Sequence, residues 1–411
     1  MTITADAPII TRTPAARLGF TAERATLADA LATVGLAVPK RPAVPTLGGV
    51  LLRAADGQLT ISATDYDTTV TVRVPGTVAT AVTLLVDHSE LTKLLGALVK
   101  GTRKRDADAL PVTVRTLDDG TPIVELAGYT MPVTAYSVGD YPIILDAAPT
   151  VAQVDRDAFA RDVARVMVAV SNDTTVPALT GINLEITPGT VTLAATDRYR
   201  LVVAPLAAVS ATYGSENARA LVPGDVVASV VKRFSSDRVR IGFDDTDNPS
   251  AVSFTCGPIS MSVRALQHQF PPVAQLIPDT AAGVVQTDRA ALLTATRRAA
   301  AVLDAKRHGG GHVGVTVTGD SVTVAPVLDE HADTVSAPAQ PATVDGIADA
   351  QRFRFTPAYL ADALDSFTGD TITLHAQADV NRPVLLTDSA DGLTDPAAFR
   401  HLIMPVREPR N

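Results

Sequence analysis

The chain has 411 residues and a formal net charge of −9, from 35 lysines and arginines against 44 aspartates and glutamates. Its length predicts two to four domains at about 100–200 residues per domain. The acidic balance argues against a protein that coats nucleic acid with its whole surface, and it leaves open one that meets nucleic acid on a single basic face. The single cysteine, Cys256, excludes an intrachain disulfide and gives no sign of an oxidising compartment.

The N-terminus reads MTITADAPIITRTPAAR, with an early Asp6 and no basic start followed by an apolar core. Residues 1–16 therefore predict a disordered tail and not a signal peptide. No apolar run approaches the length of about 18 residues that spans a bilayer. We expect a cytoplasmic protein with no membrane partner.

Ala-Thr-Asp closes an apolar, alternating run twice, at 63–65 and 195–197, an offset of 132 (195 − 63). At the same offset VPTLGGVLL at 44–52 falls on VPALTGINL at 176–184. A third copy, starting near 287, is fainter and has lost Thr-Asp. Several landmarks that agree at one offset predict an internal repeat.

Each copy predicts a helix, strands, a second helix and further strands. The first helices carry apolar residues at i, i+4 and i+7, the stripe of a helix with one buried face. These stripes are Leu27, Leu31 and Val34 in the first copy, and Phe159, Val163 and Val166 in the second. Runs such as QLTISAT and TVTLAAT alternate as strands do. The second helices carry Leu91, Leu94, Leu95 and Leu98, or Val226, Val230 and Phe234. Joins rich in proline and small residues predict domains at 17–148, 149–280 and 281–411.

Basic residues stand opposite these apolar stripes, and they allow two interpretations. They are Arg24, Lys93, Lys100 and KGTRKR at 100–105 in the first copy, Arg156, Arg161, Arg165, Lys232 and Arg233 in the second, and Arg289, Arg297 and Arg298 in the third. The faces are either simply solvated, or the helices face inward and their cations line one surface. Such a lining would attract phosphates without reading sequence.

An enzyme has little support. The seven histidines form no HxxxH or His-Cys cluster, so a metal site is not indicated. GGGH at 309–312 lacks the ending of a phosphate-binding loop. Asp65 and Asp197 each follow a strand, where an aspartate more simply caps a turn. We expect no catalytic residue, no metal and no cofactor.

The phrases RPAVPTLGGVLLRAADGQLTISATDYD, LAATDRYRL, QFPPVAQLIP and LIMPVR stand in an order that resembles the bacterial DNA polymerase III beta subunit, the sliding clamp, over roughly residues 18–407. The resemblance implies an α+β DNA-clamp fold: three repeated domains, each with two helices packed on antiparallel sheets, joined head to tail in a homodimeric ring around double-stranded DNA. It implies a non-catalytic, cytoplasmic and nucleoid-associated processivity factor. The implied partners are the DNA polymerase III alpha subunit, the clamp loader, and other polymerases and repair proteins with clamp-binding peptides.

The resemblance also implies site residues. Those of the partner-peptide pocket are Leu179, Thr196, Tyr199, Arg200, Leu201, Pro271, Gln275, Leu276, Tyr359, Pro383, Met404, Pro405, Val406 and Arg407. DNA contact carries over to Arg41 with Lys40 beside it, and by helix position to Arg24, Arg161, Arg165, Lys232, Arg233, Arg297 and Arg298. The subunit interface would involve Val302 and Leu303, with the Tyr141 region opposite.

This chain departs from the family pattern near the pocket. Where the family usually reads ATDGHRL, Arg198 replaces a glycine and Tyr199 a histidine, while Gln275 and Val406 stand where arginine and methionine are common. Two alternatives remain open: a divergent main clamp, or a second-copy clamp whose altered pocket shifts its partner set or resists a pocket-binding inhibitor. A rival of another class is a β-rich scaffold that assembles without DNA.

Overall fold

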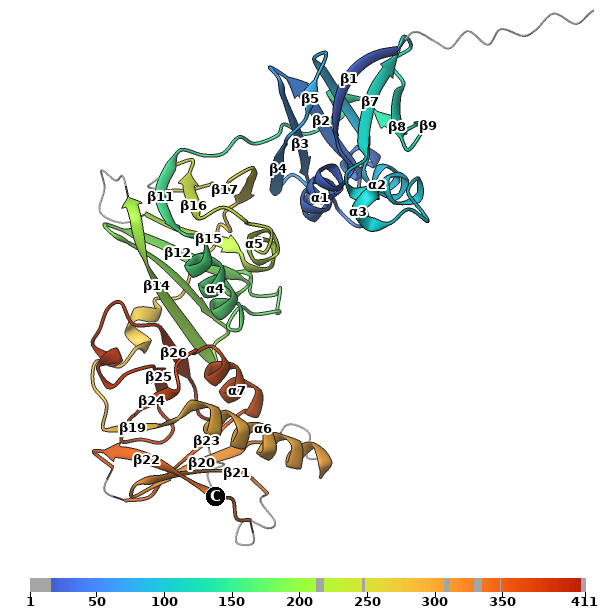
Figure 1. Cartoon of the computed structure of the whole chain (residues 1–411). Coiled ribbons are helices and arrows are strands. Elements are labelled where there is room, and N and C mark those ends of the chain that lie inside the picture. Colours follow the sequence, from blue (N-terminus) through green and yellow to red (C-terminus); the bar gives the residue numbers. More distant parts are fainter. Residues whose placement is uncertain are drawn as a thin grey trace, which may run out of the picture. The chain divides into compact units, whose positions relative to one another are not determined.

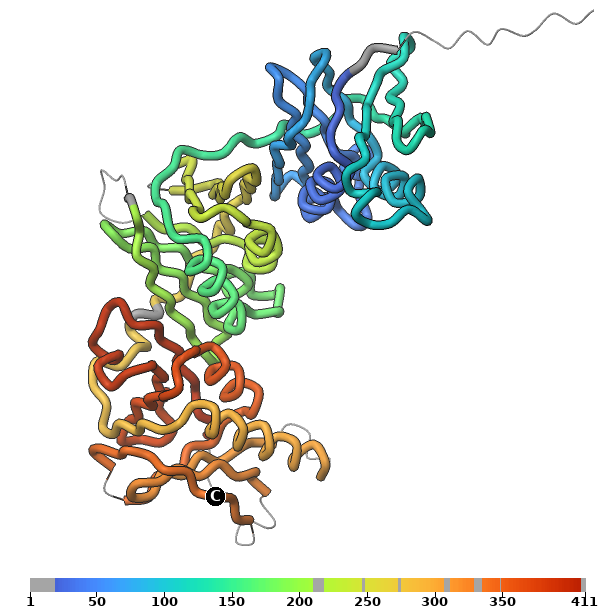
Figure 2. Tube along the Cα trace, in the orientation of Figure 1, coloured from blue at the N-terminus to red at the C-terminus, as the bar shows by residue number. Residues whose placement is uncertain are grey.

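A computed structural model describes the chain at residues 16–211, 218–245, 248–306, 311–328, 335–347 and 349–407. The tail expected at 1–16 lies outside these residues, Ala16 excepted. Contacts divide the chain into two compact units (Figures 1 and 2). Unit 1 takes the chain up to Ala148, Arg233–Ser235 and Ser253–Val263, and unit 2 takes Pro149–Lys232, Ser236–Val252 and the chain from Arg264 onward.

Unit 1 packs three helices on one side of its antiparallel strands (Figure 1). The helices are α1 (Arg24–Val34), α2 (His88–Ala97) and the short α3 (Lys104–Asp108). The strands are β1 (Ala16–Glu23), β2 (Gly49–Ala55), β3 (Gln58–Thr64), β4 (Thr68–Val74), β5 (Thr77–Val78), β6 (Val82–Asp87), β7 (Pro111–Leu117), β8 (Pro122–Leu126), β9 (Tyr129–Pro132) and β10 (Ala135–Tyr136). One sheet runs β5-β1-β7-β8-β9.

Unit 2 holds two further sets of the same kind of elements. Its helices are α4 (Arg156–Met167), α5 (Gly224–Val231), α6 (Arg289–Ala305) and α7 (Pro357–Asp365). Its strands up to the middle of the chain are β11 (Thr150–Asp155), β12 (Gly181–Thr187), β13 (Thr190–Thr196), β14 (Arg200–Ala211), β15 (Ala218–Pro223) and β16 (Arg238–Phe243). The later strands are β19 (Gly283–Asp288), β20 (Val313–Thr318), β21 (Ser321–Pro326), β22 (Ala339–Asp345), β23 (Gln351–Phe355), β24 (Thr371–Ala376), β25 (Val384–Thr387) and β26 (Arg400–Ile403).

The strands β17 (Ala251–Cys256) and β18 (Ile259–Arg264) belong mostly to unit 1, because β18 pairs antiparallel with β4. The same arrangement occurs in unit 2, where β26 pairs antiparallel with the start of β14. In both cases a strand from one repeat therefore extends the sheet of the repeat before it.

The helices α2, α4 and α6 each begin at an aspartate that caps them. Asp87, Asp155 and Asp288 each end a strand, and each side chain accepts a hydrogen bond from the backbone N–H three residues on, at 2.7, 3.0 and 2.6 Å. This contact satisfies one of the amide donors left free at a helix N-terminus and is worth about 1 kcal/mol. The helices are then held by their apolar stripes: α1 buries Leu27 and Leu31 completely.

The repeat is visible in the element bounds. The offset between β2 and β12 is 132 (181 − 49), and it is the same between β3 and β13 (190 − 58). It grows to 136 between β6 and β15 (218 − 82), so the second repeat has four more residues between the start of β14 and β15 (136 − 132). The boundaries predicted at 17, 149 and 281 stay predictions.

Three residues of the predicted stripes, Leu94, Leu98 and Val226, are only partly buried. Val226 is only partly buried, and Val227 takes the core position at 1% exposed. The α5 helix spans eight residues from Gly224. Its buried valines are Val227, Val230 and Val231, so the buried face lies one position later than the predicted stripe at Val226.

Candidate functional site

The turn that joins β13 to β14, Thr196–Arg200, carries several pocket candidates. Asp197 ends the strand, and its Oδ1 accepts hydrogen bonds of 3.0 Å from the N–H groups of Tyr199 and Arg200. This is the turn-capping role expected for Asp197, and it is confirmed. Thr196 closes the turn, because its hydroxyl donates to the Arg200 carbonyl at 2.7 Å. The backbone therefore fixes the direction in which Tyr199 and Arg200 leave the sheet.

Arg200 is the centre of the site. Its Nε lies 3.1 Å from Asp197 Oδ2, and its Nη1 donates to Asp362 Oδ2 on α7 at 2.6 Å. Its guanidinium carbon stands 4.5 Å from the centroid of the Tyr359 ring. Only 12% of the Arg200 side chain is exposed, so these contacts are partly desolvated and fix α7 against the turn.

Two aromatic rings form a surface above Arg200. The Tyr199 and Tyr359 rings stack at 6.0 Å between centroids with 26° between their planes. Tyr199 is 56% exposed, so one face is available to a ligand. Burial raises the pKa of Tyr359 above its ordinary value, which keeps its phenol a neutral hydrogen-bond donor.

The end of the chain completes the site. The Met404 N–H donates to the Tyr199 carbonyl at 2.8 Å, and the Val406 N–H donates to the Arg354 carbonyl at 2.7 Å. Beneath them Leu201, Leu385 and Leu402 form a buried apolar cluster against which Ile277 packs. The site is therefore built from three segments that are far apart in the sequence.

The predicted pocket residues divide by exposure. Leu179, Thr196, Leu201 and Pro405 are buried, Arg200, Pro271, Tyr359, Pro383, Met404 and Val406 are half-buried, and Tyr199, Gln275, Leu276 and Arg407 are exposed. The contacts above join Thr196, Tyr199, Arg200, Leu201, Tyr359 and Met404. Sequence reasoning missed Asp362, because its partner Arg200 lies 162 positions away in the sequence.

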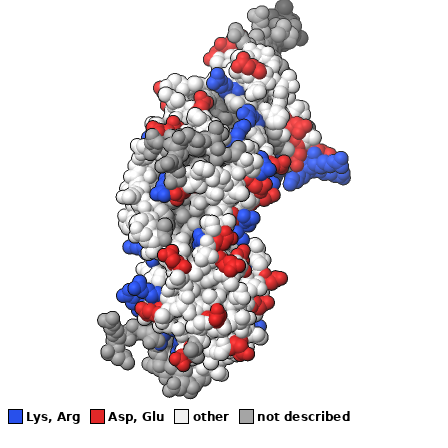
Figure 3. All heavy atoms as spheres, turned by 90° about the vertical axis from the view of Figure 1, so that its left-hand side faces the viewer, with Lys and Arg blue, Asp and Glu red and all other residues white. Residues whose placement is uncertain are grey.

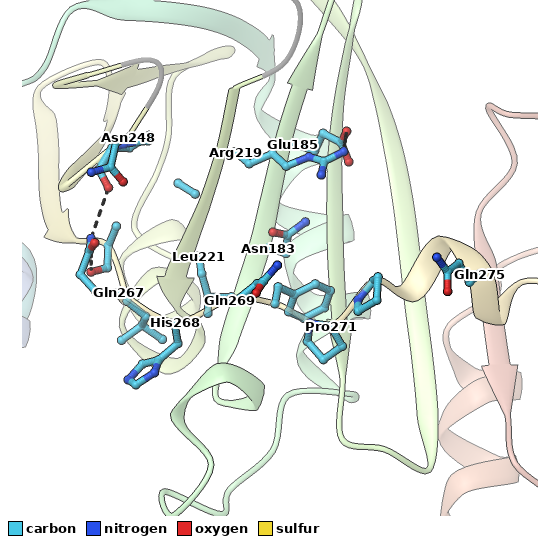
Figure 4. Close-up of a pocket in the computed structure, with 16 residues that line it drawn as sticks. Asn183, Glu185, Arg219, Leu221, Asn248, Gln267, His268, Gln269, Pro271 and Gln275 are labelled. Carbon is cyan, nitrogen blue, oxygen red and sulfur yellow. Dashed lines mark hydrogen bonds and ion pairs between the residues drawn. The ribbon is translucent and has the colours of Figure 1, made fainter.

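A hollow of about 600 Å³ with a mixed polar and apolar lining adjoins two of these residues. Its floor is the outer face of β12 and β15, with the Arg219–Glu185 ion pair, and the segment that crosses it carries Gln269, Pro271 and Gln275 (Figure 4). Pro271 and Gln275 line this hollow, which the residues of the Arg200 cluster do not line, and their place in the peptide pocket stays a prediction.

The predicted DNA-contact residues fall into two groups. Lys40, Arg41, Lys232 and Arg298 are exposed and have no ion-pair partner in the part of the chain that the structure describes. Arg233 lies 3.5 Å from Asp29, and Arg297 pairs with Asp365; both side chains are largely exposed. On the side of unit 2 turned away from its helices, Figure 3 shows lysines and arginines mixed with acids and uncharged surface. Among the residues that the structure describes, no continuous positive lining is visible on that side.

Arg24, Arg161 and Arg165 are engaged within the protein. Arg24 pairs with Asp108 and is 15% exposed. Arg161 and Arg165 both bind Asp162, and the Arg165 guanidinium lies 4.5 Å from the Phe399 ring centroid. Arg165 is also 15% exposed, and burial lowers its pKa. Arg24 and Arg165 thus have little exposed surface, and their contact with DNA stays a prediction.

The interface candidates also differ in exposure. Val302 is 41% exposed on α6, whereas Leu303 is a core residue at 3%. Tyr141 is buried too: its hydroxyl donates to the Gly49 carbonyl and accepts from the Thr64 N–H, both at 3.1 Å, and burial raises its pKa to about 12. These placements leave Val302 as a surface contact and give Leu303 and Tyr141 internal packing roles.

Comparison with known proteins identifies the family. The models of the N-terminal and central domains of the DNA polymerase III beta subunit match residues 18–142 and 153–272. The beta sliding clamp of Micrococcus luteus is 31% identical over 288 residues, which are 69% of this chain and 88% of that protein. The chain belongs to the bacterial beta sliding clamp family.

Other relatives extend the likeness along the chain. The beta sliding clamp of Streptomyces coelicolor and the beta sliding clamp homolog GriR of Streptomyces muensis are each 27% identical, over 94% of this clamp and 98% and 99% of their own lengths. The Bacillus subtilis sliding clamp has a TM-score of 0.82 at 20% identity, over 96% of this chain and all of its own. A Pseudomonas aeruginosa clamp bound to griselimycin has a TM-score of 0.79 at 19% identity, over 95% and 100%. The predicted DNA-clamp fold is confirmed.

The family is a non-catalytic processivity factor of DNA replication, so this clamp is a DNA sliding clamp and not an enzyme. Among the residues that the structure describes, no three His, Cys, Asp or Glu side chains gather as a metal site would need. Within the same residues, every helix is too short or too polar to cross a membrane.

Proposed function

We propose that this clamp holds its partners through a short peptide of theirs, bound at the turn Thr196–Arg200 and the end of the chain. The observation that carries the proposal is the Arg200 cluster, which fixes two stacked tyrosines beside the buried leucines. Apolar walls with a few polar groups at the rim suit a peptide anchored by hydrophobic side chains. The partners of this site are the DNA polymerase III alpha subunit, the clamp loader, and other polymerases and repair proteins with clamp-binding peptides.

The physical role of the peptide is to keep a polymerase near the primer end. A closed ring around duplex DNA leaves only by opening or by sliding off an end, so weak contacts to DNA suffice. A partner tethered to that ring rebinds at a high effective concentration after each dissociation. The exposed Lys40, Arg41, Lys232 and Arg298 would supply sequence-independent contacts to phosphates.

The ring would be a homodimer joined through α6. A hollow of about 740 Å³ lies along this helix, lined by its small residues with Arg298 and Val302, and by β21. An exposed apolar patch with a polar rim is typical of a protein–protein contact. Val302 faces this hollow, whereas Leu303 points into the core.

Binding of a labelled peptide ending in Gln-Leu-x-Leu-Phe tests the site. We expect saturable binding to the intact clamp, weakened at least tenfold, or about 1.4 kcal/mol, by Tyr359→Ala, because that change removes one of the stacked rings. Tyr129→Ala, which replaces an exposed tyrosine of unit 1 (58%), is the matched control. Equal weakening by both variants, or no saturable binding up to high micromolar peptide, would refute the proposed site.

Retention on nicked circular DNA, after loading by a clamp loader, tests the ring. A topological clamp stays on circles and runs off once the circle is cut. Equal loss from circular and cut DNA would contradict ring closure by this chain, whatever its peptide affinity.

A second candidate is a clamp with an altered pocket that shifts its partner set or resists an inhibitor. The observation that favours it is the pair Arg198 and Tyr199, because Arg198 adds a side chain that is 62% exposed at the turn carrying the pocket. Griselimycin, the ligand of the Pseudomonas aeruginosa structure, is the probe. Griselimycin binding restored at least tenfold by Arg198→Gly with Tyr199→His would support this candidate, and equally tight binding to both forms would rule it out.

A further inference from the structure

The segment that joins the first repeat to the second carries exposed apolar side chains. Ile143 is 87% exposed, Leu145 37% and Val138 40%. Ile143 is the most exposed large apolar side chain in the part of the chain that the structure describes. Ile144 is half-buried between Ile143 and Leu145, so these two side chains lie on the solvent side of the segment. We call Val138, Ile143 and Leu145 the linker ridge.

The linker ridge is fastened to the core of unit 1 at two points. Tyr141 is buried, and its hydroxyl accepts a hydrogen bond of 3.1 Å from the Thr64 N–H. Further along, the Ser262 hydroxyl of β18 donates to the Asp146 carbonyl at 3.3 Å. The exposed side chains of the ridge therefore belong to an anchored segment and not to a loose end of the chain.

The corresponding segment between the second and third repeats is placed differently. At the offset of 132, Leu145 corresponds to Ile277 (277 − 145). Ile277 is half-buried and packs against the buried cluster of Leu201, Leu385 and Leu402. Leu145 remains exposed. One linker therefore packs this side chain on an apolar floor, and the other presents it to solvent.

The strands beneath each linker explain the difference. Under the second linker, Leu201 of β14 stands opposite Leu402 of β26. Under the first, the equivalent positions hold Thr69 of β4 and Ser262 of β18, and both are buried. A buried hydroxyl needs a hydrogen-bond partner, and an apolar side chain gives it none. The Ser262 hydroxyl bonds to the linker backbone instead, and the apolar side chains of the ridge stay in water.

The surroundings of the linker ridge are acidic. The segments that carry or anchor it are residues 64–68, 138–146 and 259–264. Their charged residues give a formal charge of −3 (1 − 4), and they are Arg264, Asp65, Asp67, Asp140 and Asp146. An exposed apolar patch with a charged rim is typical of a protein–protein contact, and the sign of the rim selects a partner of opposite charge.

We propose that the linker ridge is a docking surface for a segment of a partner protein in which apolar side chains are flanked by lysines or arginines. Ile143 and Leu145 supply the apolar contact. Asp140 and Asp146, both exposed, supply the acidic rim. Because the ridge is already anchored, a partner does not have to order it on binding. This surface lies within unit 1 and is separate from the peptide site proposed at Thr196–Arg200.

Fluorescence anisotropy with two labelled synthetic peptides tests the proposal on the full-length clamp. The first probe is Lys-Leu-Phe-Lys-Lys-Leu-Leu-Lys, and the second has glutamate in place of every lysine. We expect saturable binding of the lysine probe, at least tenfold tighter than that of the glutamate probe and weaker as salt is raised. Equal binding of the two probes, or no saturable binding of the lysine probe, would overturn the proposal.

A double variant locates the apolar contact. Ile143→Ser with Leu145→Ser changes two exposed side chains, so the fold should persist, which thermal unfolding followed by circular dichroism checks. We expect the lysine probe to bind at least tenfold more weakly. The matched control, Leu36→Ser with Val209→Ser, replaces apolar side chains that are 42% and 56% exposed elsewhere. This control should change the affinity less than about twofold, and equal weakening by both variants would contradict a contact at the ridge.

A second pair of variants tests the acidic rim. We expect Asp140→Asn with Asp146→Asn to weaken the lysine probe about threefold at low salt and hardly at high salt, because exposed charge pairs are screened. Asp118→Asn with Asp320→Asn makes the same change in net charge at exposed positions outside the three segments. An equal effect of the two variants would show that the net charge of the whole chain attracts the probe, and would overturn the role of the rim.

Two further measurements separate this surface from other sites. Arg200→Ala, which should lose the Gln-Leu-x-Leu-Phe peptide, should bind the lysine probe as the intact clamp does. Loss of the lysine probe in that variant would assign it to the peptide pocket and overturn the ridge. Co-sedimentation with phosphatidylcholine vesicles gives the other measurement. Sedimentation that Ile143→Ser with Leu145→Ser abolishes would overturn a protein partner in favour of a lipid surface.

Discussion

Two turns of this clamp have the same backbone conformation but different side chains. In the turn at Thr64–Thr68, Asp65 Oδ1 accepts from the Asp67 and Thr68 N–H groups, as Asp197 does in the turn at Thr196–Arg200. Tyr66 and Arg198 occupy the same position, with φ of 81° and 79°. Both turns lead into a strand that pairs with a strand from the following repeat, β4 with β18 and β14 with β26.

The difference lies in the residue that ends each turn. Thr68 is buried at 4%, whereas the equivalent Arg200 reaches Asp362 and the Tyr359 ring. Both turns close a sheet junction, and Arg200 also joins its turn to α7. The same turn geometry thus occurs twice, and a few side chains distinguish the copy at which we propose peptide binding.

Replacing Arg200 should have the largest effect on the difference between the two turns. Arg200→Ala removes the bond to Asp362 and the support of Tyr359, while Asp197 keeps its two backbone donors. We expect peptide affinity to fall at least tenfold, or about 1.4 kcal/mol. Fluorescence polarisation with a Gln-Leu-x-Leu-Phe peptide measures it.

Thr68→Ala changes the matched position of the other turn. Its side chain is buried away from the pocket residues, so it should cost stability without changing peptide affinity. Equal losses of affinity in the two variants would mean that the pocket does not depend on Arg200.

The two strand junctions should also differ in their response to pH. Val202 of β14 stands opposite His401 of β26, whereas Val70 of β4 stands opposite Met261 of β18. His401 and Met261 are both fully buried. Burial, and next the positive charge of Arg200, lowers the pKa of His401 to about 3. Its Nδ1 lies 3.1 Å from the Ser366 hydroxyl, which itself donates to the Ala363 carbonyl, so Nδ1 carries the proton.

A folded-state pKa below the unfolded value of about 6.5 means that the unfolded chain binds the proton more readily. The contribution of His401 to stability is therefore complete above pH 6.5 and is lost as pH falls toward 3. We expect unit 2 to lose about 2 kcal/mol between pH 7.5 and 5 from this group, and His401→Met to remove that loss. The chain has no tryptophan, so urea unfolding is followed by circular dichroism. An unchanged pH dependence in the variant would contradict the assignment.

Much of the fold follows from local pattern, since the helix stripes and the capping aspartates are read within a few residues. The Asp197 turn was predictable for the same reason, because all its contacts lie within four positions. Periodicity shows which face of a helix is buried, and it does not show what meets the polar face.

The features that sequence reasoning missed depend on contacts between residues far apart in the sequence. Arg165 meets Phe399, 234 positions away (399 − 165), and is therefore half-buried and not a free cation. Leu303 followed Val302 as an interface candidate, but the helix turns about 100° per residue and sends it into the core. The likeness to a family predicted the pocket segments, and it could not show that Asp362 completes the Arg200 cluster.

Introducing glycine at the left-handed position of each turn should have the smallest effect on stability. A side chain in the left-handed region costs about 1 kcal/mol, which glycine avoids at some cost in chain entropy. Tyr66→Gly and Arg198→Gly should each raise stability by about 0.5 kcal/mol. Arg198→Gly also gives up a 3.6 Å pair with Asp173, but both side chains are largely exposed, so little is lost. Because only Arg198 adjoins the pocket, we expect peptide affinity to change in that variant alone. A change in both would show that the strained turns influence the pocket through the fold and not through the Arg198 side chain.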